Sequence, residues 1–328
     1  MSQSFAQLSD PHLSTLAGVR PAQLLNKRAL GYLSWRRRRR FEHQRAVLDA
    51  LQQDLDLGKL DQLLVTGDLT HIGLPEEFQQ GREWLEGLGS AAQVALVPGN
   101  HDACIAAPWE QTFALWQDYM ASDTHADLNS SSSNTSESNT SSLTTASSGA
   151  SSRNSFPSLR IRGGIAFIGL STACPTPPLM ATGTAGQEQL AKLPALLEQA
   201  KQDGLFRVLY LHHCPVVGQD KWRKRLTDAP DVQALLEQHG VELVVHGHGH
   251  REHYVELTTC DGVAPVIAVP SASALGLHGA DVARYNHYRV DALDKGWQLQ
   301  IAQRRYDVEE GVFIAGDSRT VELVRQGN

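Results

Sequence analysis

The stretch "VELVVHGHGHREH", residues 241–253, indicates the fold of this protein most directly. Four apolar residues lead into a run that contains four histidines. A short run rich in valine and leucine that stops at a polar cluster is typical of a strand buried on both faces. Side chains two residues apart on an extended chain point to the same side, so His248 and His250 can offer paired imidazoles. The stretch therefore predicts a buried strand with metal-type ligands beyond its end.

The same pattern occurs four more times along the chain. The apolar runs in "SFAQLSDPH", "DQLLVTGDLT", "AQVALVPGNHD" and "FRVLYLHHCP" each stop at polar residues. Helical patterns at residues 40–59, 75–89, 188–202 and 229–240 separate several of these strands. Alternating strands and helices predict an α/β fold, in which ligands bind beyond the carboxyl ends of the strands. We therefore expect the five polar clusters to meet at one rim.

Two further segments complete the predicted organisation. Past Cys260, "APVIAVPSAS", "HYRVDAL" and "GWQLQIAQRRYD" are predicted strands, the last two joined by a turn at residues 294–296. They predict an antiparallel continuation or a second sheet. Residues 129–155 are nearly all Ser, Thr and Asn, which predicts a disordered insertion. We expect one domain over residues 1–328.

Composition limits the classes of function. The 328 residues are 41% hydrophobic and carry a net charge of −7, which argues against a general nucleic-acid binder. The four cysteines lie far apart without a C-x-x-C pair, so the spacing predicts a reduced compartment and no thiolate zinc site. No signal peptide precedes the first strand, and no apolar run approaches the ~18 residues of a membrane span. We expect a cytoplasmic protein.

The polar clusters share one kind of chemistry. They supply carboxylate, amide and imidazole groups, which bind divalent first-row metals without sulfur. Seven such groups are too many for one tetrahedral ion and suit two ions about 3.5–4 Å apart that share a carboxylate. Two dications leave a net positive charge that attracts a phosphate ester and lowers the pKa of a bound water. The donors in the clusters are Asp10, His12, Asp68, Asn100, His101, Asp102, His212, His213, His248 and His250.

In this order, the five motifs resemble those of the calcineurin-like metallophosphoesterase superfamily, from residue 5 to about 270 outside the Ser-rich insertion. The resemblance implies an αββα sandwich of four layers, two mixed β-sheets flanked by helices, and two divalent ions such as Mn, Fe or Zn. One ion would be held by Asp10, His12 and His250, the other by Asn100, His212 and His248, with Asp68 bridging them. A metal-bridging hydroxide would attack phosphorus in line.

The resemblance also implies roles for neighbouring residues. His101 would contact a phosphoryl oxygen and assist the leaving group, and Asp102 would orient His101. His213 could replace His212 as a ligand or orient it. For His246 and His253 the pattern favours hydrogen-bonded surface residues.

A basic and aromatic segment at residues 20–45 stands out against the acidic average. It holds nine cations against the single anion Glu42, with Leu30, Tyr32, Leu33 and Trp35 beside five consecutive arginines. A second segment, "DKWRKRL" at residues 220–226, has the same character. Such segments either contact an anionic membrane, clamp an extended anion, or are ordinary solvated charged faces.

The sequence thus predicts a metal-dependent phosphoester hydrolase with several candidate substrates. The resemblance favours a phosphodiesterase acting on cyclic nucleotides or glycerophosphodiesters. The alternative is a peripheral-membrane pyrophosphatase on a lipid-linked substrate such as UDP-diacylglucosamine, which the basic and aromatic segments favour. The acidic net charge disfavours a nuclease. The complete ligand set disfavours a scaffold without turnover.

Overall fold

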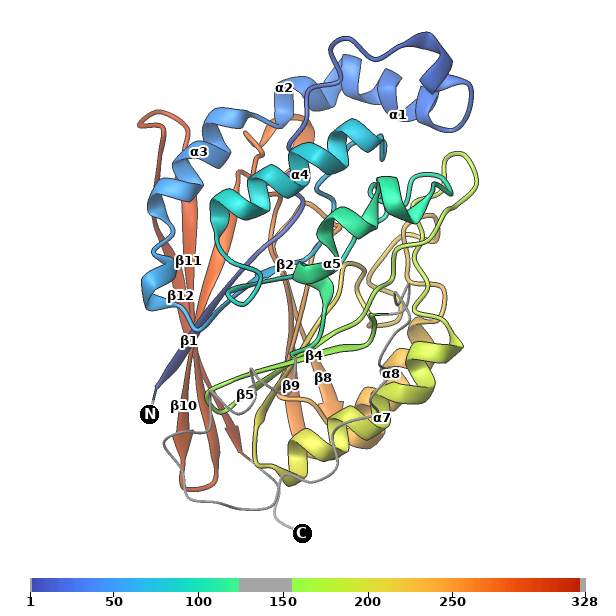
Figure 1. The fold of residues 1–328 in the computed structure, drawn as a ribbon. Helices are drawn as coiled ribbons and strands as arrows, with labels where there is room; N and C mark the ends of the chain where they lie inside the picture. The colour runs from blue at the N-terminus through green and yellow to red at the C-terminus, as the bar shows by residue number, and fades with distance from the viewer. Residues whose placement is uncertain (1, 124–154, 325–328) are drawn as a thin grey trace.

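The computed structural model describes residues 2–123 and 155–324, and this part of the chain forms two mixed six-stranded sheets packed face to face (Figure 1). The strand order is β12-β11-β10-β1-β2-β3 in the first sheet and β4-β5-β6-β7-β9-β8 in the second. Helices cover the outer face of each sheet. This arrangement confirms the four-layer αββα sandwich.

The first sheet consists of β1 (Gln3–Leu8), β2 (Gln62–Val65), β3 (Val94–Leu96), β10 (Arg284–Leu293), β11 (Gly296–Asp307) and β12 (Val312–Val324). The second consists of β4 (Ser158–Arg162), β5 (Ile165–Gly169), β6 (Phe206–Tyr210), β7 (Leu243–His246), β8 (His253–Thr259) and β9 (Gly262–Ala268). The helices are α1 (Arg28–Ser34), α2 (Arg40–Glu42), α3 (Arg45–Asp54), α4 (Pro75–Leu88), α5 (Gln117–Met120), α7 (Gln187–Gln202) and α8 (Ala229–His239). Shorter turns are η1 (Pro21–Leu24), η2 (Trp35–Arg39), η3 (Leu57–Lys59), η4 (Trp109–Gln111), η5 (Phe113–Trp116) and η6 (Leu277–Gly279).

Strand direction brings the polar clusters together. Strands β1, β2 and β3 run parallel in the first sheet, and β5, β6 and β7 run parallel in the second. The polar clusters that follow β1, β2, β3, β6 and β7 therefore lie at the carboxyl ends of parallel strands, on the same edge of each sheet. The strands after residue 260 are divided between the sheets: β9 pairs with β7 and β8, whereas the β10–β11 hairpin extends the first sheet from β1.

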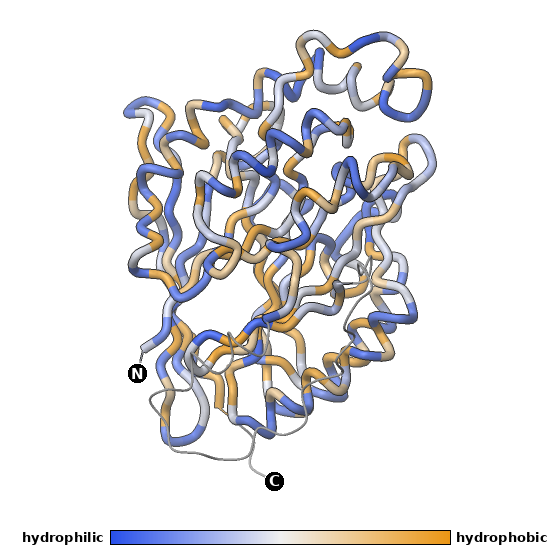
Figure 2. The backbone as a smooth tube through the Cα atoms, viewed as in Figure 1, coloured by the Kyte–Doolittle hydropathy of each residue, from blue (hydrophilic) through white to orange (hydrophobic). Residues whose placement is uncertain are grey.

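Apolar packing holds the layers together. Between the sheets, Phe5 stacks on Tyr288 with ring centroids 4.7 Å apart and meets the edge of Phe167 at 5.1 Å. Each such buried side chain contributes about 1.5–3 kcal/mol through the hydrophobic effect. On the outer face of the first sheet, α3 buries Val47 and Leu51 as its apolar spacing predicts. Figure 2 shows hydrophobic colour along the strands and hydrophilic colour on the outward helix faces.

The helix expected over residues 40–59 is interrupted. Helix α2 ends at Glu42, the chain is extended at His43 and Gln44, and α3 ends at Asp54. The Gln44 N–H donates to the carbonyl of Ser273 at 3.0 Å, and His43 forms an isolated β-bridge with Ala274. Pairing with this distant segment replaces the helical hydrogen bonds, so the helix pattern was overridden by tertiary contacts.

Two remaining expectations concern segments rather than elements. The Ser-rich insertion at residues 129–155 lies outside the described residues, apart from Ser155. Among the described helices, none combines the length and the apolar character that crossing a membrane requires.

Candidate metal centre and active site

The backbone is unusual at the predicted ligands. In the described chain, six residues other than glycine have a positive φ between 43° and 68°. Five of the six are predicted ligands: Asp10, His12, Asp68, His248 and His250. A non-glycine residue in this region costs about 1–3 kcal/mol, and such strain persists where surrounding contacts enforce it, often at functional sites. The fold therefore holds these side chains in orientations that the local sequence disfavours.

The loops after β1 and β2 enforce this backbone. The Asp10 N–H donates to the Gly67 carbonyl at 2.9 Å, and the His12 N–H donates to the Asp68 carbonyl at 3.1 Å. A Cβ at Gly99 would overlap the Asp68 carboxylate, so only glycine allows the loop after β3 to approach. The three loops are thus fixed against one another.

A first ligand cluster forms around Asp10. Ligand atoms of Asp10, His12, Asp68 and His250 all lie within 4.8 Å of one another. His250 Nε2 is 3.1 Å from Asp10 Oδ1 and 3.5 Å from His12 Nε2. His12 Nδ1 donates to the Thr70 carbonyl at 2.9 Å, so His12 Nε2 carries a lone pair. Lone pairs of nitrogen and oxygen that converge in this way bind a cation.

A second cluster forms around His212. Its Nδ1 donates to the Thr66 carbonyl at 2.7 Å, so Nε2 is the nitrogen that could bind a cation after losing its proton. That atom lies 3.2 Å from Asn100 Oδ1 and 3.3 Å from Asp68 Oδ2. His248 Nε2 is buried without a hydrogen-bond partner. Asp68 reaches both clusters, which is the position that a bridging carboxylate occupies.

The neighbouring His213 is engaged elsewhere. Its Nδ1 lies 2.7 Å from the Thr172 hydroxyl, and its Nε2 lies 3.3 Å from the Ala181 carbonyl. Its ring centroid is 4.4 Å from that of His248. Ligand atoms of His212, His213 and His248 nevertheless lie within 4.8 Å of one another. His212 Nε2 faces Asp68 and Asn100 whereas His213 faces Thr172 and Ala181, and the choice of His212 as the ligand stays a prediction.

Electrostatics also favour positive charge at this rim. Burial opposes ionisation of Asp10, yet the His250 imidazole holds the pKa of Asp10 well below its usual range. Burial lowers the pKa of His212, but the Asp68 and Asp10 carboxylates and the hydrogen bond to the Thr66 carbonyl together outweigh burial and raise that pKa to about 9. Together with the unpartnered His248 Nε2, these features fit oxygen- and nitrogen-binding divalent ions. The residues therefore fit a pair of divalent cations.

Asp102 has a different role from the predicted one. Its Oδ1 accepts hydrogen bonds from the Thr70 N–H and hydroxyl at 2.9 and 3.0 Å. Its Oδ2 accepts from the N–H groups of Asp68 and Gly99, both at 2.9 Å. Burial, followed by the nearby Asp68 carboxylate, raises the pKa of Asp102 to about 7. Asp102 thus ties the ligand loops together.

The expectation that Asp102 orients His101 was wrong, because both Asp102 oxygens are turned to those loops. His101 Nδ1 instead lies 2.6 Å from the His71 carbonyl, to which it must donate. The His101 N–H donates to Asp68 Oδ1 at 2.7 Å. Burial and the nearby Arg39 lower the pKa of His101 well below its usual range. In the free protein His101 is therefore neutral, with the lone pair on Nε2.

Arg39 is the arginine of the basic segment that reaches the site. Its Nη1 lies 3.0 Å from His101 Nδ1, whereas the other four arginines of residues 36–40 are exposed. The segment is anchored by Trp35, which packs in a small buried cluster with Leu16 and Ile72. The sequence identified the segment but could not identify Arg39, because η2 is a π-helical turn whose facing depends on this anchoring.

Two further histidines were missed by the sequence analysis. His43 has a ligand atom within 4.8 Å of those of His12 and His250. The His71 ring stacks on the His12 ring, with centroids 5.0 Å apart. Burial, followed by Arg39, lowers the pKa of His71 to about 3, so its ring is neutral. The sequence signal for His71 was its position in "DLTHIG", three residues after Asp68. His43 had no such signal, because its position depends on the break between α2 and α3.

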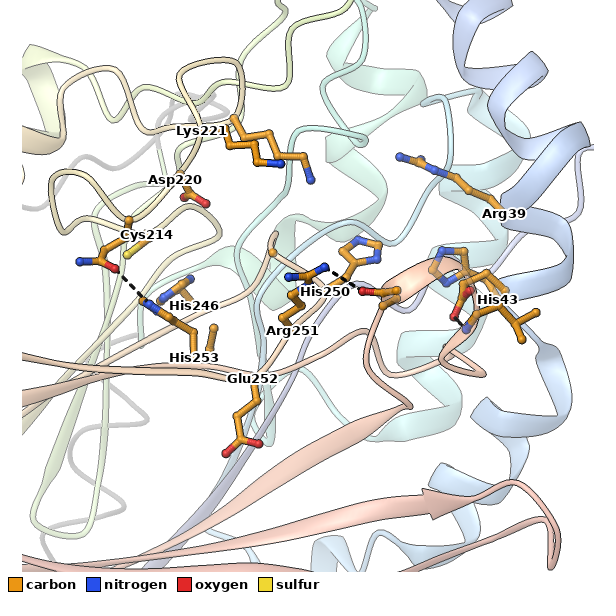
Figure 3. A pocket seen from close by; sticks show the side chains of 18 of the residues that line it. Arg39, His43, Cys214, Asp220, Lys221, His246, His250, Arg251, Glu252 and His253 are labelled. Carbon is orange, nitrogen blue, oxygen red and sulfur yellow. Dashed lines mark hydrogen bonds between the residues drawn. The ribbon is translucent and has the colours of Figure 1, made fainter.

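A cleft of about 690 Å³ adjoins the first cluster, and His43 and His250 line it. Figure 3 shows Arg39, His43 and His250 toward one side of this pocket, and Cys214, His246 and His253 toward the other. Five cations line it, Arg38, Arg39, Lys221, Lys224 and Arg251, against the three carboxylates of Glu42, Asp220 and Glu252. The cleft therefore attracts anions.

The fold and donor set define a metal-dependent phosphoester hydrolase. The model of the Calcineurin-like phosphoesterase family matches residues 4–252, and the chain belongs to that family, whose members use two divalent metals. No curated protein sequence gave a significant match.

Solved structures with related folds include a dimetal phosphatase from Danio rerio, with 12% identity, a TM-score of 0.50, and 98% of this chain and 99% of that chain covered. Others are Vps29 of Chaetomium thermophilum (12% identity, TM-score 0.39, 98% of each chain covered) and a phosphatase of Mycoplasma pneumoniae (14% identity, TM-score 0.37, 99% and 94% covered). At 12% identity, the likeness to the Danio rerio phosphatase concerns the fold alone.

Proposed function

We propose that this phosphoester hydrolase acts on an amphiphilic substrate, a lipid-linked pyrophosphate such as UDP-diacylglucosamine, at the surface of an anionic membrane. The observation that carries the proposal is the group of exposed apolar side chains on the segment that also delivers Arg39. Leu25 is 85% exposed, and Leu30, Leu33 and Phe41 are each more than 40% exposed. Apolar side chains beside a run of arginines are typical of an interfacial membrane contact.

The stretch of chain that carries the exposed apolar side chains is anchored to the protein and also places Arg39 beside the active site. Arg28 is buried and donates to the Ile72 carbonyl at 3.0 Å, and Trp35 is buried beneath the segment. Arg39 points from the same segment into the cleft, while Arg36 and Arg37 remain exposed. A membrane bound by the outer residues would therefore lie beside the cleft. Each exposed cation adds about 1 kcal/mol of attraction to an anionic surface.

A second edge of the cleft has the same composition. Trp222 is 59% exposed, and the Arg223 guanidinium lies 5.0 Å from the centre of its ring. Leu179 and Trp222 line a largely apolar depression of about 460 Å³, together with Lys221 and Lys224. Lys221 and Lys224 also line the main cleft. A substrate with phosphate in the cleft could thus direct an acyl chain along this depression.

The protein groups act on the substrate in defined ways. The ligand clusters around Asp10 and His212 would hold two divalent ions, which would supply Lewis-acid chemistry and lower the pKa of a water molecule. Arg39 offers a guanidinium that can bind phosphoryl oxygens with two hydrogen bonds. A phosphate next to Arg39 offsets the charge that lowers the pKa of His101. His101 then takes up a proton on Nε2 and donates it to the leaving oxygen.

A soluble phosphodiester is the second candidate. A cleft of about 690 Å³ is large enough for a cyclic nucleotide or a glycerophosphodiester. Such substrates have no apolar chain, so they leave the exposed Leu25, Leu30, Leu33 and Phe41 without a function. We therefore rank this candidate below the lipid-linked one.

A substrate panel tests the proposal. Purified protein reconstituted with Mn²⁺ would be assayed on UDP-diacylglucosamine, on its deacylated counterpart, on cyclic nucleotides and on glycerophosphodiesters. We expect kcat/KM for the acylated substrate to exceed that of the deacylated one by at least about tenfold, because apolar burial contributes only when the chain is present. Equal rates on both, or faster turnover of a cyclic nucleotide, would contradict the lipid-linked proposal.

Membrane contact is tested separately with liposomes. We expect binding to anionic liposomes by co-sedimentation, and weaker binding by the triple variant Arg36→Ser, Arg37→Ser, Arg40→Ser, which spares Arg39. Arg82→Ser, on the exposed face of α4, is the matched control and should bind like the wild type. Undiminished binding of the triple variant would remove the membrane role from this segment.

A further inference from the structure

A third group of metal-ligand side chains lies in the cleft, apart from the seven predicted ligands. Ligand atoms of Cys214, His246 and His253 all lie within 4.8 Å of one another. Cys214 follows β6, His246 ends β7 and His253 begins β8, so three separate segments bring these groups together. Figure 3 shows the three side chains on the same side of the pocket, away from Arg39 and His43.

The buried imidazole of His246 has one ring nitrogen without a hydrogen-bond partner. Its side chain is only 4% exposed, which corrects the expectation of a surface residue. Its Nδ1 lies 3.1 Å from the Gly247 carbonyl and donates to it, so Nε2 carries the lone pair. That Nε2 is buried and has no hydrogen-bond partner. An unpaired buried acceptor costs about 1–3 kcal/mol, which a ligand can offset.

The half-buried His253, at the start of β8, also lines the cleft. One of its ring nitrogens, Nε2, lies 3.1 Å from Gln219 Oε1, an acceptor, and therefore donates to it. The other ring nitrogen then carries a lone pair. His246 and His253 have ring centroids 6.1 Å apart. Cys214 is buried and forms no disulfide; burial raises the pKa of its thiol to about 12, so a bound cation must displace the thiol proton.

We propose that Cys214, His246 and His253 form a third metal site, for a zinc-type cation such as Zn²⁺ or Co²⁺. One thiolate with two imidazoles is a donor set that these borderline-soft ions prefer. Around one tetrahedral zinc, such donor atoms stand roughly 3.3–3.7 Å apart, so the present spacing closes with side-chain movements of about 1 Å. Three protein ligands leave a fourth position open to the cleft, whose lining includes Asp220 on the same wall (Figure 3).

The cysteine spacing predicted no thiolate zinc site, because such predictions rely on pairs such as C-x-x-C. Here Cys214 is the single sulfur ligand, and its two partners come from other strands. The sulfur also distinguishes this site from the two ligand clusters, which contain only oxygen and nitrogen donors.

Cobalt spectroscopy tests the site directly. Full-length protein would be stripped with a chelator and titrated with Co²⁺, with absorbance and bound metal both recorded. We expect a near-ultraviolet thiolate-to-cobalt charge-transfer band that accounts for one of three bound equivalents. Cys214→Ser should lose the band and that equivalent. The control Cys260→Ser, at an exposed cysteine, should keep both.

A second variant covers the case in which Cys214→Ser does not fold, as judged by circular dichroism. His253→Ala changes a half-buried side chain and should weaken cobalt binding at this site by at least roughly tenfold. No band in the wild-type protein, a band that persists in Cys214→Ser, or unchanged titration of His253→Ala would overturn the proposal. The readout does not depend on which phosphoester is hydrolysed.

Discussion

Asp68 Oδ2 lies 3.3 Å from His212 Nε2, and this contact joins the two sheets of the sandwich. Asp68 follows β2 in the first sheet, whereas His212 follows β6 in the second. Both side chains are almost fully buried. In the metal-free protein the Asp68 carboxylate helps to keep the imidazole protonated at this depth, and a divalent cation would take the place of that proton. The metal centre therefore sits at the seam between the layers, where it can affect both chemistry and stability.

Removal of the Asp68 carboxylate should abolish hydrolysis. We expect Asp68→Ala to lower kcat on p-nitrophenyl phosphate by about 10³-fold or more, because it removes the one carboxylate that reaches both clusters. Bound metal, measured by elemental analysis, should fall with it. The control Asp56→Ala, at an exposed aspartate, should leave activity unchanged. Activity of Asp68→Ala within tenfold of the wild type would refute the dinuclear assignment.

Chelation should destabilise the fold as well as stop turnover. Ions that bind only the folded state, at a free concentration 1,000 times their Kd, stabilise that state by about 4 kcal/mol. We therefore expect Tm, measured by calorimetry, to fall by several degrees in excess chelator and to recover with Mn²⁺. The Asp68→Ala variant should show a smaller shift. An equal shift in that variant would place the stabilising ions elsewhere.

Arg39 should contribute to phosphate binding. A guanidinium with charge-assisted hydrogen bonds to phosphate contributes roughly 1.5–3 kcal/mol, so Arg39→Ala should lower kcat/KM by about 10- to 100-fold. Arg37→Ala provides a matched control, because that arginine is exposed on the same segment. A small soluble substrate keeps membrane effects out of the comparison. Equal losses in both variants would assign the effect to net charge and not to position.

The same variant predicts a change in pH dependence. Burial and the Arg39 charge lower the pKa of His101. Removing that charge makes protonation easier, so the pKa of His101 should rise. The limb of the pH–rate profile that requires protonated His101 should then move to higher pH in Arg39→Ala. Arg39→Lys keeps the charge and should move the limb less; movement to lower pH would contradict the role given to His101.

Gly99 should tolerate no side chain. Gly99→Ala would force the new Cβ into the Asp68 carboxylate, displacing the ligand loop and weakening metal binding. Gly87→Ala is the matched control, because its Cβ would meet only Gln52 at 3.5 Å on a helix. There alanine should stabilise the protein by about 0.5–1 kcal/mol, measured by urea unfolding. Full metal binding by Gly99→Ala would contradict this prediction, because it would show that the loop after β3 can move without displacing Asp68.

Some features could be predicted from local sequence alone. The runs that became β1, β2, β3, β6 and β7 were recognised because burial on both faces requires continuous apolar residues. The hairpin of β10 and β11 was recognised from its turn. Strands β4, β5, β8 and β12 were not predicted. Many of the β12 residues are exposed and its pattern is therefore weak, whereas the apolar run of β5 is fully buried and was overlooked.

The sequence by itself determined an α/β fold and the oxygen and nitrogen donors at the ends of its strands, because apolar runs and strand periodicity are local properties. Only the tertiary structure decided that Arg39 enters the cleft, that His71 and not Asp102 orients His101, and that Cys214 meets His246. The physical reason is that these contacts depend on which backbone groups of distant segments pair across the two sheets. No spacing along the chain records that pairing.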